Sequence, residues 1–131
     1  MLMADSFSGY FEFKQLKEST SEEVIKFLKE KFACFGCPEE FHSDGGPQYS
    51  SKLFIDFAKD WDFRHEKSSP GFPRANGFAE RYVQSAKNLI RKCALSGEDP
   101  YRVLLLLRNT PGQNLSSPIE RLMGRKTRNK L

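Results

Sequence analysis

Residues 67–77 form the clearest interruption of the helix and strand patterns in this 131-residue sequence. The segment Lys-Ser-Ser-Pro-Gly-Phe-Pro-Arg-Ala-Asn-Gly holds two prolines and two glycines in eleven residues, which excludes a regular helix or strand. Strand and helix patterns alternate before it, and only helical patterns follow. The order strand, strand, helix, strand, helix, strand and then helices predicts an α/β or α+β chain with a mixed sheet.

Local signals give the boundaries of these elements. Ser19-Thr-Ser-Glu22-Glu23 offers two overlapping capping boxes for a helix that ends near Gly36. The predicted elements are a hairpin from residues 1–5 and 10–16, a helix at 20–35, a strand at 40–44, a helix after Ser50-Ser51, a strand at 63–66, and helices at 75–96, from Pro100, and at 118–123.

Composition narrows the class of protein. The net charge is +4 with a pI near 9.0, which favours nucleic acid as a partner. No apolar run is long enough for a membrane span, and the N-terminus does not resemble a signal peptide, so we expect an intracellular protein without a membrane partner. Residues 121–131 hold five basic residues and no acid, and they are either a solvated tail or a further nucleic-acid contact.

The three cysteines do not suggest a disulfide framework, because their number is odd and low. Cys34 and Cys37 form a C-x-x-C pair, and a zinc site would need two further ligands from Cys93, His42 and His65. The spacing of those three matches no zinc motif. We therefore favour small residues at a helix end over a zinc-binding interaction module.

Asp44 and Glu80 are candidate catalytic carboxylates because of their positions in the predicted elements. Asp44 ends a predicted strand just before Gly45-Gly46-Pro47, and open α/β sheets place functional groups at such strand ends. Glu80 lies in the first turns of the helix after the Pro/Gly-rich loop. Carboxylate oxygens suit Mg²⁺ and Mn²⁺, and pairs of such ions support phosphoryl transfer.

A polar stripe follows Glu80 along the same helix. Gln84, Lys87 and Arg91 come four, seven and eleven residues later, so they share its face. The stripe would suit a phosphate backbone beside a metal ion, and a solvated helix face is the alternative explanation.

Five segments of the sequence, considered together in their order along the chain, resemble segments of a known protein family. His42-Ser-Asp44-Gly-Gly-Pro-Gln-Tyr-Ser-Ser51 and Ser68-Ser-Pro-Gly-Phe-Pro-Arg-Ala-Asn-Gly77-Phe-Ala-Glu80-Arg contain the carboxylates, with thirty-five residues between Asp44 and Glu80. The others are Asp5-Ser-Phe-Ser-Gly-Tyr-Phe-Glu, Arg108-Asn-Thr-Pro111 and Ser117-Pro-Ile-Glu-Arg-Leu-Met-Gly-Arg125. Together they resemble the catalytic core of retroviral and gypsy-type LTR-retrotransposon integrases over essentially the whole chain.

The resemblance implies an RNase H-like fold and Mg²⁺- or Mn²⁺-dependent cutting and joining of DNA ends in the nucleus. It makes Asp44 and Glu80 the second and third catalytic, metal-binding carboxylates. Asn76 and Lys87 become candidate DNA contacts, and Arg74 adds charge near the DNA path. It also implies a homo-oligomer formed through the helix at residues 100–109.

The chain departs from that family pattern at its start. The family's first carboxylate lies on a central opening strand, whereas Asp5 matches the hairpin that follows it. We therefore expect residues 1–120 to be a partial core without that strand, with a weakened metal site, followed by a basic tail at 121–131. Smaller departures are Arg74-Ala75, where a Gln-Ser type pair is common, and Gly45, where Asn is common.

Two functions remain open. The first is an integrase core acting on DNA ends with metal ions. The second is a catalytically dead, element-derived remnant that binds nucleic acid or associates with itself. Strand-transfer activity that depends on Asp44 and Glu80 separates the two.

Overall fold

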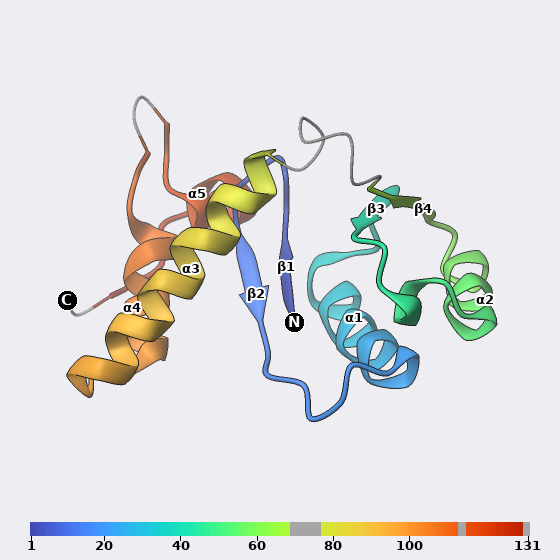
Figure 1. The fold of residues 1–131 in the computed structure, drawn as a ribbon. Coiled ribbons are helices and arrows are strands. Elements are labelled where there is room, and N and C mark those ends of the chain that lie inside the picture. Colours follow the sequence, from blue (N-terminus) through green and yellow to red (C-terminus); the bar gives the residue numbers. More distant parts are fainter. Residues whose placement is uncertain (69–76, 113–114, 130–131) are drawn as a thin grey trace. The chain divides into compact units, whose positions relative to one another are not determined.

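The computed structural model describes residues 1–68, 77–112 and 115–129 (Figure 1). Its elements are β1 (Leu2–Ala4), β2 (Phe11–Phe13), α1 (Ser21–Phe35), β3 (Glu40–Ser43), the 3₁₀ helix η1 (Pro47–Tyr49), α2 (Lys52–Asp60), β4 (Arg64–Lys67), α3 (Gly77–Ser96), α4 (Pro100–Asn109) and α5 (Pro118–Met123). This order confirms the predicted alternation and adds η1.

The chain forms two compact units, each described by itself. The first unit comprises Met1 and Lys14–Asn76, and it contains α1, β3, η1, α2 and β4. The second unit comprises Leu2–Phe13 and Gly77–Leu131, and it contains the hairpin and the three C-terminal helices.

A parallel strand pair and two helices build the first unit. β3 and β4 pair in parallel from Glu40↔Arg64 to Ser43↔Lys67, and η1 and α2 form the connection between them. α1 begins at the second of the two predicted capping boxes, where Thr20 Oγ1 accepts a hydrogen bond from the Glu23 N–H. The predicted cap of α2 is also present, since Ser51 Oγ accepts from the Phe54 N–H at 3.2 Å.

Aromatic rings fill the core of the first unit. Phe54 on α2 is fully buried, with the Phe57, Phe63 and Tyr49 rings around it at centroid distances of 5.7, 6.3 and 5.3 Å. Phe32 of α1 stacks on Phe57 at 6.1 Å, which fastens α1 to α2. The apolar faces predicted for both helices are therefore the faces that pack together.

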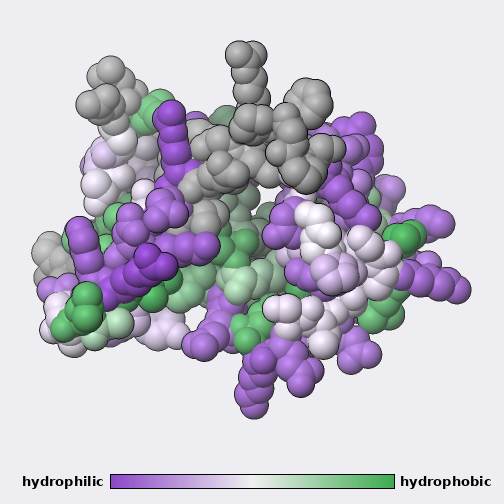
Figure 2. Space-filling model, in the orientation of Figure 1, coloured by the Kyte–Doolittle hydropathy of each residue, from purple (hydrophilic) through white to green (hydrophobic). Residues whose placement is uncertain are grey.

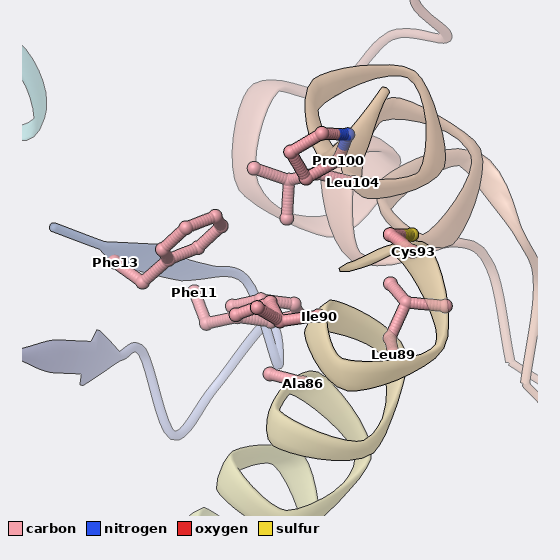
Figure 3. A pocket seen from close by; sticks show the side chains of 8 residues that line it. All are labelled: Phe11, Phe13, Ala86, Leu89, Ile90, Cys93, Pro100 and Leu104. Atoms are coloured by element: carbon pink, nitrogen blue, oxygen red, sulfur yellow. The ribbon is translucent and has the colours of Figure 1, made fainter. Parts of the chain in front are cut away.

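The hairpin supplies one wall of the second unit's core. β1 and β2 are antiparallel, with Leu2 opposite Phe13 and Ala4 opposite Phe11. Figure 3 shows Phe11 and Phe13 facing side chains of α3 and α4. The residues that line this apolar space are Phe11, Phe13, Ala86, Leu89, Ile90, Cys93, Pro100 and Leu104. The gap between them has no room for a water molecule, so it is core rather than a binding cavity.

Replacing Phe54 by alanine tests the aromatic core. We expect Phe54→Ala to lower the free energy of unfolding by roughly 3–5 kcal/mol, because it removes a ring that is fully enclosed by others. Urea unfolding followed by circular dichroism measures the change. Leu53→Ala on the same helix is the control, since Leu53 is 49% exposed and should cost less than about 1 kcal/mol. Equal losses from the two variants would contradict this packing.

Candidate functional site

Asp44 is the first residue after β3 and lies at its carboxyl end, as the sequence predicted. Its side chain is exposed, and its Oδ1 accepts a hydrogen bond from the Gly46 N–H at 2.9 Å. Within the described part of the chain, Oδ2 accepts none. One carboxylate oxygen is thus fixed by the backbone of the turn.

A hydrogen-bond network lies directly behind Asp44. Ser43, the last residue of β3, is buried, and its Oγ donates to the Asp44 carbonyl at 2.9 Å. The same Oγ lies 2.7 Å from Nε2 of His65 on the neighbouring strand β4. The strand pairing extends one step further, because the Ser68 N–H donates to the Ser43 carbonyl at 2.9 Å.

The ionisable groups near Asp44 respond to burial and charge. Burial and then the negative charge of Asp44 raise the pKa of the Tyr49 phenol. Burial lowers the pKa of His65, and the charge of Lys67 acts in the same direction. Both shifts favour the neutral forms of Tyr49 and His65 at pH 7.

Helix α3 separates polar from apolar residues cleanly. Gln84, Lys87 and Arg91 are all exposed, whereas Ala86 and Cys93, on the opposite side of the helix, are buried. Figure 2 shows hydrophilic side chains gathered over α3. Gln84 also donates from Nε2 to Asn88 Oδ1 at 3.3 Å. The predicted stripe is thus present as one solvent-facing surface, which we name the α3 polar face: Gln84, Lys87 and Arg91.

Other predicted site residues fall outside the described set. Arg74 and Asn76 lie in the segment 69–76, which the structure does not describe. Glu80 lies in the first turn of α3, but its side chain is not among those described. Among the described residues, no three His, Cys, Asp or Glu side chains are grouped to hold a metal ion.

Asp5 has a role within the hairpin turn. Its Oδ2 accepts from the Ser8 N–H at 2.9 Å and from the Ser8 hydroxyl at 2.5 Å. Both bonds close the turn between β1 and β2, where Gly9 adopts a left-handed φ of 74°. The carboxylate is therefore engaged by the turn itself.

The C-x-x-C pair lies at the end of α1. Cys34 and Cys37 are both exposed, and the Cys37 thiol donates to the Trp61 carbonyl at 3.1 Å. Burial, together with the charge of Asp62, raises the pKa of this thiol, so it is a poor thiolate donor at pH 7. This environment gives no support to the zinc hypothesis.

Sequence reasoning did not find the hydrogen bonds of Asp44 with Ser43 and Gly46, or the contact of Ser43 with His65. Ser43 and Gly46 stand within the quoted aspartate segment, but nothing in the sequence shows their hydrogen bonds. His65 was considered only as a zinc ligand, because its contact with Ser43 depends on the strand register. No single-sequence signal identifies that register.

Comparison with known proteins assigns the family. Residues 1–73 match the family model described as "Integrase core domain". The chain belongs to the integrase core domain family. A relative in Caenorhabditis elegans, "Uncharacterized protein K02A2.6", is 34% identical over 98% of this chain. The chain spans only 11% of the length of that relative.

Solved structures show the same fold. The chain resembles a simian T-cell lymphotropic virus intasome chain with a TM-score of 0.79 and 23% identity, covering 98% of this chain and 49% of that one. It resembles the trimeric form of the HTLV-2 integrase catalytic core domain in complex with magnesium with a TM-score of 0.75 and 22% identity, covering 92% and 82%. The predicted RNase H-like α/β fold is confirmed, whereas the missing opening strand stays a prediction.

Two further predicted features of this integrase core are helix α4 and the basic segment after α5. On α4, Leu104 is buried, while Tyr101 and Leu106 are 73% and 45% exposed. After α5, Arg125, Lys126 and Arg128 are exposed, and Thr127 Oγ1 donates to Asn109 Oδ1 at 2.9 Å. The basic segment is thus held against the end of α4. None of the helices in the described ranges is both long and apolar enough to cross a membrane.

Protonation of His65 is expected to destabilise the folded chain. Because its pKa is lower in the folded state, the unfolded chain binds this proton more readily. The penalty is absent above the ordinary histidine pKa of about 6.5 and grows as the pH falls below it. We expect the urea midpoint to fall between about pH 7 and about pH 5.5.

The same titration in two variants assigns this pH dependence. His65→Gln should flatten it over that range, whereas His42→Gln, which removes only the last-ranked of the charge effects on His65, should retain most of it. An unaltered slope in His65→Gln would show that His65 is not the responsible group.

Proposed function

We propose that this chain acts in DNA integration, as an integrase core that binds DNA and contributes Asp44 and Glu80 as metal-binding carboxylates for cutting and joining DNA ends. The observation that carries the proposal is the exposed Asp44 carboxylate at the carboxyl end of β3, with Oδ1 fixed by the Gly46 N–H. Membership of the integrase core domain family supplies the reaction class.

The donor chemistry of Asp44 suits a hard divalent cation. A carboxylate whose position is fixed by the backbone loses little freedom on binding a metal, and oxygen ligands are those that Mg²⁺ and Mn²⁺ prefer. Asp44 and Glu80 are the residues that would hold the ion. When bound, it would stabilise negative charge on the phosphate oxygens during DNA cutting and joining. The related HTLV-2 core was solved in complex with magnesium.

DNA would lie along the α3 polar face. Lys87 and Arg91 offer positive charge to phosphates, and Gln84 offers a neutral donor beside them. Glu80 precedes Gln84 by four residues in the sequence, the spacing expected for one helical face. Arg74 and Asn76, just before α3 in sequence, are proposed as further contacts. These roles also make the nucleus the expected place of action.

Removing either carboxylate tests the catalytic function. We expect Asp44→Asn and Glu80→Gln each to lower Mg²⁺-dependent strand transfer by at least about 100-fold. Losing a metal ligand should cost more than the roughly 10- to 100-fold typical of groups that only orient a ligand. The assay uses a labelled DNA end and a target duplex with the full chain.

The matched controls each remove one exposed carboxylate from elsewhere in the chain. Asp56→Asn on α2 and Glu98→Gln after α3 change exposed acids at positions with no proposed metal role. They should retain activity. Activity that survives both Asp44→Asn and Glu80→Gln would refute the assignment of these residues.

A second candidate function is nucleic-acid binding and self-association without cleavage. The exposed charges of α3 and of Arg125, Lys126 and Arg128 do not depend on a metal ion. The exposed Tyr101 and Leu106 give α4 an apolar surface for a second copy. A purified chain that binds DNA but never cuts it would support this function over the first.

Salt dependence of DNA binding tests the α3 polar face under either function. We expect Lys87→Gln and Arg91→Gln each to weaken binding and to reduce the slope of log K against log salt by about 1, because each removes one phosphate contact. Fluorescence anisotropy at several salt concentrations measures both quantities. Lys92→Gln, an exposed lysine on the same helix outside the stripe, should leave the slope unchanged. Equal effects from all three would indicate diffuse charge attraction instead of a defined contact face.

A further inference from the structure

The position of Asp44 is set by hydrogen bonds rather than by packing. It joins the four-residue strand β3 to Gly45 and Gly46, and a side chain at Gly45 would meet no atom within 4 Å. A side chain at Gly46 would instead meet the Gln48 side chain at 2.7 Å, so the open space of the turn is confined to Gly45. The Gly46 N–H holds the carboxylate from the turn side, and a further link to Asp44 comes from the strand side.

The Ser43 hydroxyl provides that link from the strand. Its Oγ donates to the Asp44 carbonyl at 2.9 Å and lies 2.7 Å from His65 Nε2. A hydroxyl has one proton, which the bond to Asp44 uses, so the contact with His65 requires Nε2 to carry the proton. The geometry thus specifies one imidazole tautomer, with Nε2 protonated and Nδ1 bare.

His65 is itself held firmly by the aromatic core. Its ring lies edge-on to Phe54 with centroids 4.8 Å apart, and the Phe41 and Tyr49 rings lie 5.9 and 6.0 Å away. The strand register also places His65 directly opposite Phe41. A continuous path of contacts therefore runs from the buried core of the first unit to the peptide of Asp44.

We propose that His65 and Ser43 are positioning residues for Asp44: His65 Nε2–H donates to Ser43 Oγ, the Ser43 hydroxyl donates to the Asp44 carbonyl, and the carboxylate is thereby held for a divalent cation. Only the last clause rests on the proposed function. The alternative is that Ser43 only satisfies the hydrogen-bonding need of a half-buried imidazole, without an effect on Asp44. The His65 tautomer and the environment of the Asp44 carboxylate distinguish the two.

The first experiment needs no variant. ¹⁵N NMR of the histidine side chains in the full chain at pH 7.5 reports which imidazole nitrogen of His65 is protonated. We expect protonated Nε2 and bare Nδ1. The reverse tautomer would make Nε2 an acceptor, would take the hydroxyl proton away from Asp44, and would overturn the proposal.

The second experiment uses the Gly46 amide as a reporter of the Asp44 carboxylate, since that amide donates to Oδ1 at 2.9 Å. Ser43→Ala removes the hydroxyl, and His65→Phe keeps an aromatic ring against Phe54 while removing the donor. Without metal present, both should shift the Gly46 amide resonance away from its position in the unmodified chain. Ser43→Thr, which retains the hydroxyl, should restore that position.

A titration with Mg²⁺ alone then links the arrangement to metal binding. Ser43→Ala and His65→Phe should weaken Mg²⁺ binding by about tenfold, as expected for the loss of a group that orients a ligand, and Ser43→Thr should bind as the unmodified chain does. An unmoved Gly46 amide in both Ser43→Ala and His65→Phe would refute the positioning role. Mg²⁺ binding that Asp44→Asn leaves unchanged would instead refute Asp44 as a ligand, with the amide data still deciding the positioning role.

Discussion

The parallel pairing of β3 and β4 is the constraint on which the first unit depends. Parallel neighbours need a connection that leaves the carboxyl end of one strand and returns to the start of the next. Here η1 and α2 supply that connection. The helix must bury one face to be stable, which places Phe54 and Phe57 in the core. The chain must also leave β3 at Asp44. The exposed carboxylate and the aromatic core are thus two consequences of one pairing.

In the second unit, a single arginine connects the hairpin to helix α4. Arg108 on α4 donates from Nη2 to the Phe11 carbonyl at 2.7 Å, and its guanidinium lies 4.4 Å from the centre of the Tyr10 ring. It also pairs with Glu12 at 3.3 Å, with both side chains 16% exposed. Arg108 Nε is buried without a hydrogen-bond partner among the described residues, which has a cost. The guanidinium thus joins α4 to the hairpin through a hydrogen bond and an ion pair.

Sequence patterns were sufficient to predict the secondary-structure elements, but they were insufficient to predict the contacts between those elements. Periodicity and capping residues predicted the strands and α-helices of the described chain, because those signals are local, but they did not predict η1. They left a choice between Ser19 and Thr20 as the cap of α1, which the structure resolves in favour of Thr20. The partners of Asp44 were not predictable, since the contact of Ser43 with His65 spans twenty-two positions and depends on strand register. Arg108 was recognised only as part of a motif, because its partner Phe11 lies ninety-seven positions away.

The two parts of the proposed site differ in how closely function is tied to folding. On α3, the charged stripe and the buried stripe lie on opposite sides of one helix, so Lys87 or Arg91 can change without disturbing Ala86 or Cys93. Binding strength and stability are therefore separable there. At Asp44 they are not, because Ser43 is the buried residue of β3 and its hydroxyl also donates to the Asp44 carbonyl. Substitutions of the exposed α3 residues thus leave the packed face of that helix in place, while the surroundings of Asp44 must satisfy the strand pair and the carboxylate together.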